Sequence, residues 1–310
     1  MLRLTKLNLR LRICSPLFLA LCAAVLLTSI AVGMEFENTV YDLNPIPFFA
    51  AAAASMISTV FAAGTEFADG TVRSKLVCGI TKPRFYLSQL IASLCVSLFF
   101  FLLAGVPFFL MGRKRFFSQF DFVLLVRATV LLLAGVVFFT VIAVFITVLV
   151  KNRAAVLLVC TGAVMVLAIS ERETDWRLNR PEYTAVYRSG RETDTDEPRE
   201  SVIDYVIPND QYVSEPARTV LYTSLKVNPF QCFVSALDII RSEGEINRTS
   251  LKNIEEEYER IKNSDSKYER NADYFRDRLI NCIYYPLWSG GLMLVLTAAG
   301  VLIFRKRNIY

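Results

Sequence analysis

The sequence AGTEFADGTVRSKLVCGITKPR occupies residues 63–84, between two long apolar runs. It contains six charged side chains and is punctuated by glycine and threonine. Charged side chains are costly in the hydrocarbon core of a bilayer, so this segment cannot itself cross a membrane. It predicts a loop that joins two membrane spans, and its patterning distinguishes it from a plain spacer.

The composition of the whole chain is typical of a membrane protein. Of its 310 residues, 54% are hydrophobic and 23 are phenylalanine. The apolar residues are gathered in blocks instead of being scattered. Histidine is absent, which excludes imidazole bases, histidine metal ligands and histidine proton relays.

Six apolar blocks have about the length that a membrane-spanning helix needs, roughly 20 residues. The first block follows basic residues, as in a signal peptide, but the apolar part of a signal peptide is shorter. We therefore expect it to be retained as a span. The predicted fold is an all-α polytopic membrane protein with six transmembrane helices, at residues 13–33, 46–63, 85–111, 122–150, 154–170 and 284–304.

Charge predicts which side of the membrane each loop faces. Segments 1–12, 65–84, 151–153 and 305–310 together hold thirteen basic and two acidic residues. Residues 171–283 hold 17 basic and 23 acidic residues. The positive-inside rule then places both termini in the cytoplasm of a multi-pass protein of the cell (plasma or inner) membrane. The basic loop at 112–121 is the exception to this pattern.

This topology divides the chain into four parts. An amphipathic segment, 1–12, precedes spans one to five at 13–170, which include the cytoplasmic loop 64–84. An extracytoplasmic domain, 171–283, follows, and the sixth span with a basic tail covers 284–310. In the first segment Leu4, Leu7 and Leu11 share one helical side, so it either lies along the membrane surface or serves only as a basic topogenic tail.

The domain at 171–283 has a strand-like part and a helix-like part, which together predict a mixed α/β fold. Strand-like stretches at 201–207 and 219–227 are separated by turn-forming residues. The sequence Asn228-Pro229-Phe230 then opens a predicted helix, and 249–283 has apolar residues at helical spacing. Cys232 and Cys282 could form a disulfide in an oxidising compartment, although we favour two unpaired thiols.

Catalytic signatures are absent from the sequence. The dipeptide Gly-Lys does not occur, which rules out a P-loop, and GxSxG, HExxH and CxxC are also missing. No acidic residue lies well inside a span, which disfavours a proton- or sodium-coupled carrier. We expect no enzymatic activity, no metal site, no cofactor and no nucleic-acid partner.

The loop itself predicts a short helix at residues 72–78. Thr71 is expected to cap its start and Gly79 to end it, and Pro83 suits the first turn of the next span. Such a helix could dock on a partner and move two spans as a lever. The alternative is an ordinary re-entry turn with positive-inside residues.

The residues of this loop also resemble a known pattern. Glu66-Phe67, Gly70-Thr71, Arg73, Gly79 and Pro83-Arg84-Phe85 resemble the cytoplasmic loop of ABC type-2 transporter permeases. The six-span layout, the amphipathic entry, the basic stop after the last span and the Asn228-Pro229-Phe230 segment are similar to that family as well. The domain between spans five and six is longer than in compact members.

The resemblance implies a permease subunit that contacts a separate ABC ATP-binding subunit, which binds the ATP and Mg. Two permease chains, in a homodimer or a heterodimer, would join two ATPases in an exporter surrounded by membrane lipid. The ATPase-coupling residues that it implies are Glu66, Phe67, Asp69, Gly70, Thr71, Arg73, Lys75, Gly79 and Arg84.

Two functions remain open at this point. An exporter whose spans lack central charge would suit an amphipathic or apolar cargo, such as a peptide, drug or lipid. Alternatively, the chain is a membrane-anchored sensor or recognition protein that binds an envelope ligand through residues 171–283. An ATPase subunit that co-purifies with the chain would distinguish the first function from the second.

Overall fold

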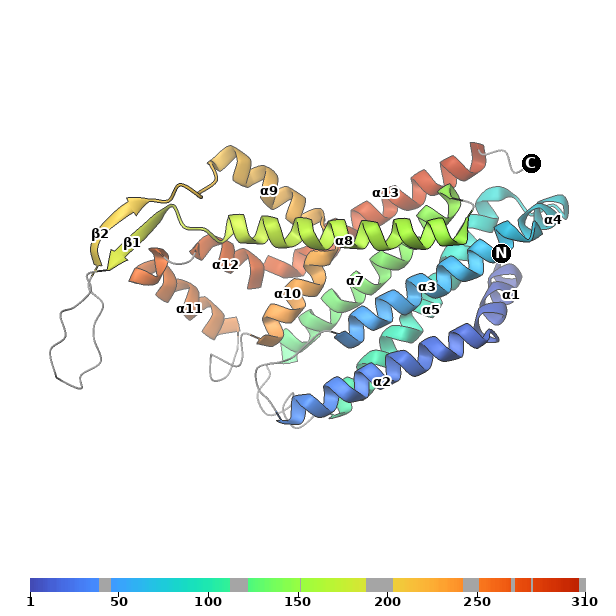
Figure 1. The fold of residues 1–310 in the computed structure, drawn as a ribbon, viewed down its shortest axis with the longest axis horizontal. Helices are drawn as coiled ribbons and strands as arrows, with labels where there is room; N and C mark the ends of the chain where they lie inside the picture. The colour runs from blue at the N-terminus through green and yellow to red at the C-terminus, as the bar shows by residue number, and fades with distance from the viewer. Residues whose placement is uncertain are drawn as a thin grey trace.

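The computed structural model describes residues 1–38, 46–111, 122–150, 152–187, 203–241, 251–268, 271–279 and 281–306. Six of its helices are long and apolar enough to cross a membrane. They run side by side in one bundle, which a smaller group of helices and two strands extends at one end (Figure 1). In lipid a helix satisfies its backbone hydrogen bonds internally, so long apolar blocks adopt this form.

The bundle is built around two central helices. These are α3 (Ile46–Ala68) and α7 (Phe122–Leu149), whose side chains are the best shielded among the spans. Ala51 in α3 and Ala143 in α7 are fully buried, as expected where small residues let helices approach closely. The other four spans are α2 (Pro16–Asn38), α5 (Lys82–Met111), α8 (Arg153–Leu178) and α13 (Tyr285–Lys306).

Several spans are longer than the apolar blocks that predicted them. The second was expected to end at Ala63, but α3 continues to Ala68 and so includes Glu66 and Phe67. The fifth was expected to end at Ser170, but α8 continues to Leu178. Hydropathy marks only the part of a helix that lipid can cover, whereas hydrogen bonding and packing decide where the helix ends.

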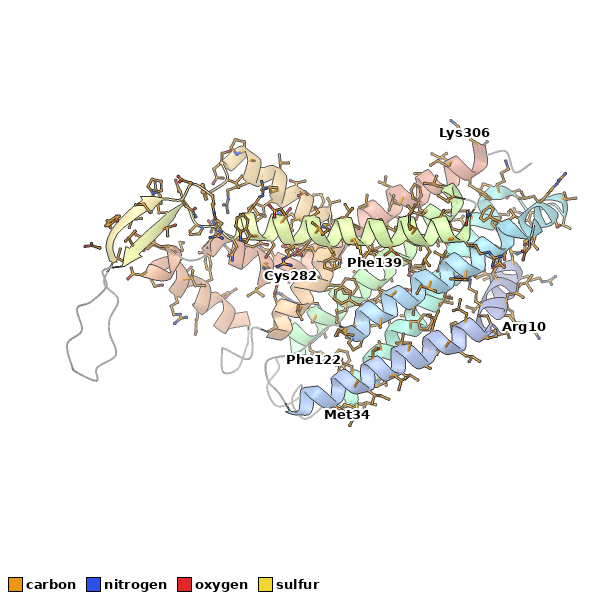
Figure 2. The ribbon with its side chains drawn as sticks, viewed as in Figure 1. Arg10, Met34, Phe122, Phe139, Cys282 and Lys306 are labelled. Carbon is orange, nitrogen blue, oxygen red and sulfur yellow. The ribbon has the colours of Figure 1, made fainter. Side chains whose placement is uncertain are left out.

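Both described ends of the chain lie at the same end of the bundle. Arg10, in the short helix α1 (Leu2–Ile13), and Lys306, near the end of α13, are close to this end, whereas Met34 and Phe122 are at the other (Figure 2). An even number of spans requires this arrangement. The predicted loop at 112–121 lies outside the described residues.

One helix of the region 171–283 packs into the bundle. The predicted helix after Asn228-Pro229 is confirmed as α10 (Phe230–Arg241). Its Phe233 is fully buried and stacks on Phe49 of α3 and Phe139 of α7, with ring centroids 4.6 and 5.7 Å away. This part of the region is therefore continuous with the core of the spans.

The β content of the region 171–283 is smaller than predicted. Among the described residues, β1 (Tyr183–Tyr187) pairs antiparallel with β2 (Ile203–Pro208), and these form one two-stranded sheet. The second predicted strand, 219–227, is wrong, because this stretch is helix α9 (Glu215–Val227). Helix formation places Leu221 and Leu225 four residues apart on one side, where they pack with the buried Leu178 and Tyr274.

The end of the region is helical, as predicted. It comprises α11 (Leu251–Asn263), η1 (Asp265–Tyr268), α12 (Ala272–Leu279) and η2 (Asn281–Tyr284). Arg278 of α12 forms ion pairs with both Asp175 of α8 and Asp238 of α10. The hydroxyl of Tyr274 also donates to Asp175. These contacts hold three helices together.

The cysteines are unpaired in the structure. Cys232 and Cys282 are both buried and free, as the sequence reading favoured. The Cys232 thiol instead lies 3.9 Å from the Ser289 hydroxyl of α13.

Candidate functional site

A short helix, α4 (Thr71–Val77), connects the ends of α3 and α5. It lies at the end of the bundle that also carries α1 and both described ends of the chain (Figure 1). The predicted helix at 72–78 is therefore confirmed within one residue at each end. Gly70 before it and Gly79 after it have φ angles of 69° and 88°, which L side chains rarely adopt.

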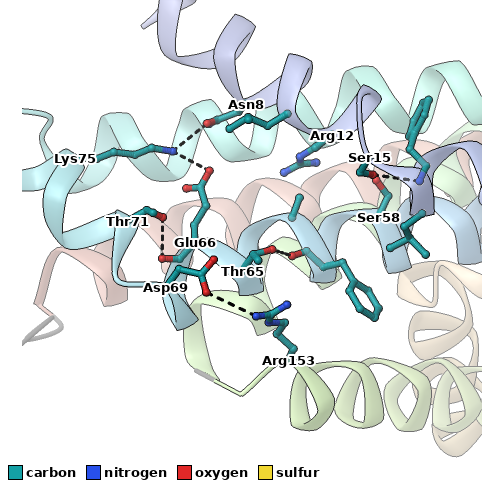
Figure 3. Close-up of a pocket in the computed structure, with 15 residues that line it drawn as sticks. Asn8, Arg12, Ser15, Ser58, Thr65, Glu66, Asp69, Thr71, Lys75 and Arg153 are labelled. Atoms are coloured by element: carbon teal, nitrogen blue, oxygen red, sulfur yellow. Dashed lines mark hydrogen bonds and ion pairs between the residues drawn. The ribbon is translucent and has the colours of Figure 1, made fainter.

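The expected cap of this helix is wrong in detail. The N-cap residue is Gly70, and Thr71 is the first helical residue. The Thr71 hydroxyl donates instead to the carbonyl oxygen of Glu66, 3.0 Å away (Figure 3). A left-handed glycine makes the reversal after α3 tight enough for this bond, so Thr71 joins the turn to the last turn of α3.

The apolar side of α4 is packed against three spans. Val72 is 1% exposed and belongs to a buried cluster with Phe85 of α5 and Phe304 of α13. Phe67 of α3 lies edge-on to both rings, with centroids 6.2 and 6.0 Å away. Movement of α4 would therefore be passed by direct contact to α3, α5 and α13.

A shielded ion pair holds α4 from its other side. Lys75 Nζ lies 2.7 Å from Glu66 Oε1, and the two side chains are only 16% and 13% exposed (Figure 3). Lys75 also donates to Asn8 Oδ1 at 3.2 Å, and Asn8 donates to the Ser88 hydroxyl at 3.3 Å. This polar chain joins α4 to α3, α1 and α5.

Helix α1 packs through its polar side. Arg12 is 3% exposed and donates to Gln89 Oε1 at 2.7 Å and to the Ser93 hydroxyl at 2.8 Å, both on α5. Burial lowers the pKa of Arg12 to about 10, while the nearby Glu66 carboxylate opposes this shift. The guanidinium therefore stays charged at neutral pH.

The leucines of α1 remain on the outside. Leu7 and Leu11 are 47% and 58% exposed, which leaves this side available to a membrane surface, one of the two alternatives that the sequence left open. Arg12 was not among the site residues predicted from the sequence. Its only signal was the spacing of Gln89 and Ser93, two polar residues four apart within an apolar span.

The outward face of α4 is open to solvent. Arg73 of α4 is exposed and Val77 is 80% exposed; Arg84, in the first turn of α5, is exposed as well. A hollow of about 540 Å³ beside Val77 is lined by Arg73, Leu76, Val77, Gly79, Ile80, Thr81 and Lys82. Two cations, Arg73 and Lys82, line this hollow together with the exposed Val77. A partner with an apolar groove and an acidic rim could bury such a surface.

The nine predicted site residues thus fall into three groups. Glu66, Phe67 and Lys75 are packed inside and attach α4 to the spans. Gly70, Thr71 and Gly79 shape the turns on either side. Asp69, Arg73 and Arg84 are on the surface, where Asp69 lies 3.8 Å from Arg153 in an exposed ion pair.

Within the described ranges, no three His, Cys, Asp or Glu side chains are grouped so that they could hold a metal ion. Comparison of the sequence with protein-family models and with curated proteins gives no match.

Proposed function

We propose that this chain is the membrane-spanning permease subunit of an ATP-driven ABC exporter, with α4 as the helix that contacts a separate ATP-binding subunit. The observation that carries the proposal is the two-sided character of α4. Its outer face exposes Val77 and Arg73, while Val72 and Lys75 are packed against the spans. A plain re-entry turn needs neither feature.

In this mechanism the ATPase moves α4 and the spans follow. Val77 enters an apolar groove of the ATPase, and Arg73 and Arg84 meet acidic groups at its rim. Closure of the ATPase on ATP displaces α4. Phe67 transmits the displacement to α5 and α13 through its ring contacts, and the Glu66–Lys75 pair keeps the helix attached to α3.

The topology proposed with this function follows the charge distribution. Both termini and α4 face the cytoplasm of a cell membrane, and the region 171–283 faces the opposite side. Two such chains, in a homodimer or a heterodimer, form the pathway. The sequences of the spans carry no acidic residue well inside, which favours an amphipathic or apolar cargo such as a peptide, drug or lipid.

The test is purification of the tagged full-length chain from its native membranes. We expect an ATP-binding subunit to co-purify, and the complex to show vanadate-sensitive ATP hydrolysis that candidate amphipathic peptides stimulate. Purification without any ATP-binding protein, together with ligand binding by the region 171–283, would instead support a membrane-anchored sensor.

A further inference from the structure

A polar cluster lies where α8, α10 and α12 meet, at the junction of the bundle with the smaller group of helices (Figure 1). Its centre is Arg278, which donates to both Asp175 and Asp238. Glu171 is one turn before Asp175 on the same side of α8, and it is 5% exposed. It is the first residue after the apolar block 154–170, so it stands at the edge of the predicted span.

The Glu171 carboxyl is the third in a cluster whose guanidinium already binds two. Asp175 Oδ1 accepts from Arg278 and from the Tyr274 hydroxyl, and Asp238 Oδ2 accepts from Arg278. Glu171 Oε1 is shielded from solvent and accepts no hydrogen bond from the described part of the chain. An ionised carboxylate in such a place is costly, because neither water nor a donor compensates its charge.

Two carboxylates and one guanidinium act directly on Glu171. These are Asp175 on the same helix, Asp238 of α10 and Arg278 of α12. The groups further out are the Tyr274 hydroxyl bound to Asp175, Cys282 of η2 close to Asp238 and to Arg127 of α7, and Arg218 of α9, which donates to the Leu178 carbonyl. Burial and two negative neighbours, which share the one direct cation, favour the neutral form of the Glu171 carboxyl.

We propose that Glu171 is a proton-binding site, and that its proton controls how firmly α10 and α12 are held against α8. With the proton bound, Arg278 joins two carboxylates beside a neutral carboxyl, and the junction is closed. Loss of the proton as the pH rises puts a third negative charge into the shielded site, one turn from Asp175. Repulsion and the cost of the buried charge then favour opening of the junction.

Proton counting gives the direction of the pH dependence. The closed junction holds a proton on Glu171, whereas in an opened junction the carboxyl is in water and is ionised at neutral pH. The closed form therefore binds more protons, and its stability falls as the pH rises. The contribution is complete where a solvated glutamate is also protonated, below about pH 4, and is lost at higher pH.

Helix α10 carries the effect from the junction into the core. Its Phe233 stacks on Phe49 of α3 and Phe139 of α7. A loosened α10 therefore changes the packing between the two central helices. This consequence holds whatever the partner of α4 is, so it does not rest on the proposed function.

The first experiment compares Glu171→Gln with Glu173→Gln in the purified full-length chain. Glutamine has the shape of the protonated carboxyl and cannot ionise, and Glu173 is a neighbour on α8 whose side chain is 55% exposed. Hydrogen exchange of the α10 and α12 amides is measured from about pH 5 to about pH 8. Comparison with wild type at each pH cancels the pH dependence of the exchange chemistry itself.

We expect opening of α10 and α12 to increase about tenfold in wild type relative to Glu171→Gln over this range. Glu173→Gln should follow wild type, because its carboxyl is in water in both forms. Parallel curves for wild type and Glu171→Gln would overturn the proposal. So would an equal effect of the two substitutions.

Infrared spectroscopy of the wild-type protein detects the proton without any substitution. A protonated carboxyl has a C=O stretching band that is separate from the bands of carboxylates. At about pH 6, where solvated carboxyl groups are ionised, we expect this band in wild type and in Glu173→Gln but not in Glu171→Gln. Its absence from wild type at this pH would refute the proposal, even if Glu171→Gln does not fold.

Discussion

Among single residues, Glu66 and Asp69 are two carboxylates three positions apart that differ in exposure. Glu66 pairs with Lys75 in a shielded site, whereas Asp69 pairs with Arg153 where the two side chains are 56% and 39% exposed. We expect Glu66→Gln to lower the free energy of unfolding by about 2 kcal/mol, because Lys75 loses its carboxylate in a shielded site. Asp69→Asn should cost less than about 0.5 kcal/mol.

Denaturation of both variants in the same detergent measures the difference. Adding Lys75→Met to Glu66→Gln should recover part of the loss, because it removes the cation that Glu66→Gln leaves without its carboxylate. If Glu66→Gln and Asp69→Asn are equally stable, the Glu66 pair does not hold α4.

Arg73 belongs to the exposed side of α4, so its substitution should affect binding and not stability. We expect Arg73→Glu to weaken association with the ATP-binding subunit about tenfold, because reversing a charge at an interface rim creates a repulsion. The melting temperature of the isolated chain should not change. Arg3→Glu, at an exposed position of α1, is the control. Wild-type ATPase association of Arg73→Glu would remove Arg73 from the contact.

The short helix of the loop was predicted from sequence, but the division of the loop residues into an inner and an outer set was not. Spacing alone predicted only a short helix at residues 72–78. That Phe67 meets Phe304, and that Lys75 reaches Asn8, depends on spans far apart in the chain. Arg12 was not predicted for the same reason, because its hydrogen-bond partners are on α5, which packs beside α1 in the fold.

At the scale of secondary-structure elements, the orientation of α4 depends on the glycine at its start. Gly70 has φ 69° and nothing within 4 Å of where a Cβ would stand, so a substitution there meets conformational strain only. We expect Gly70→Val to cost about 1–2 kcal/mol and Gly70→Asn clearly less, since Asn tolerates left-handed backbone. Hydrogen exchange of the α4 amides should be faster in the valine variant. Equal exchange in both variants would contradict this account.

The elements that hydropathy governs were predicted best. Each of the six predicted spans coincides with a described helix that is long and apolar enough to cross a membrane, because apolar blocks of that length are typical of such helices. The strand predicted at 219–227 failed because its valine, tyrosine and threonine residues favour strands locally. Packing of Leu221 and Leu225 against Leu178 and Tyr274 prevailed over that preference.

For the whole molecule, Arg278 joins α12 to α8 and α10, two helices that pack in the bundle. It pairs with Asp175 of α8 and Asp238 of α10, and all three side chains are at most 24% exposed. Arg278→Gln would remove the cation that Asp175 and Asp238 share. We expect a loss of about 3–5 kcal/mol, the usual cost of breaking a buried ion pair from one side.

The loss should be local to the region that Arg278 holds. Amides of α10 and α12 should exchange faster in Arg278→Gln, while those of the central helices α3 and α7 keep their protection, because the packed core of the spans is unchanged. Arg177→Gln is the matched control, since its pair with Glu173 is exposed and lies within one helix. Adding Asp238→Asn should restore part of the protection by removing one of the two carboxylates left without Arg278. Uniform loss of protection over the spans would instead mean that the region and the bundle unfold as one unit.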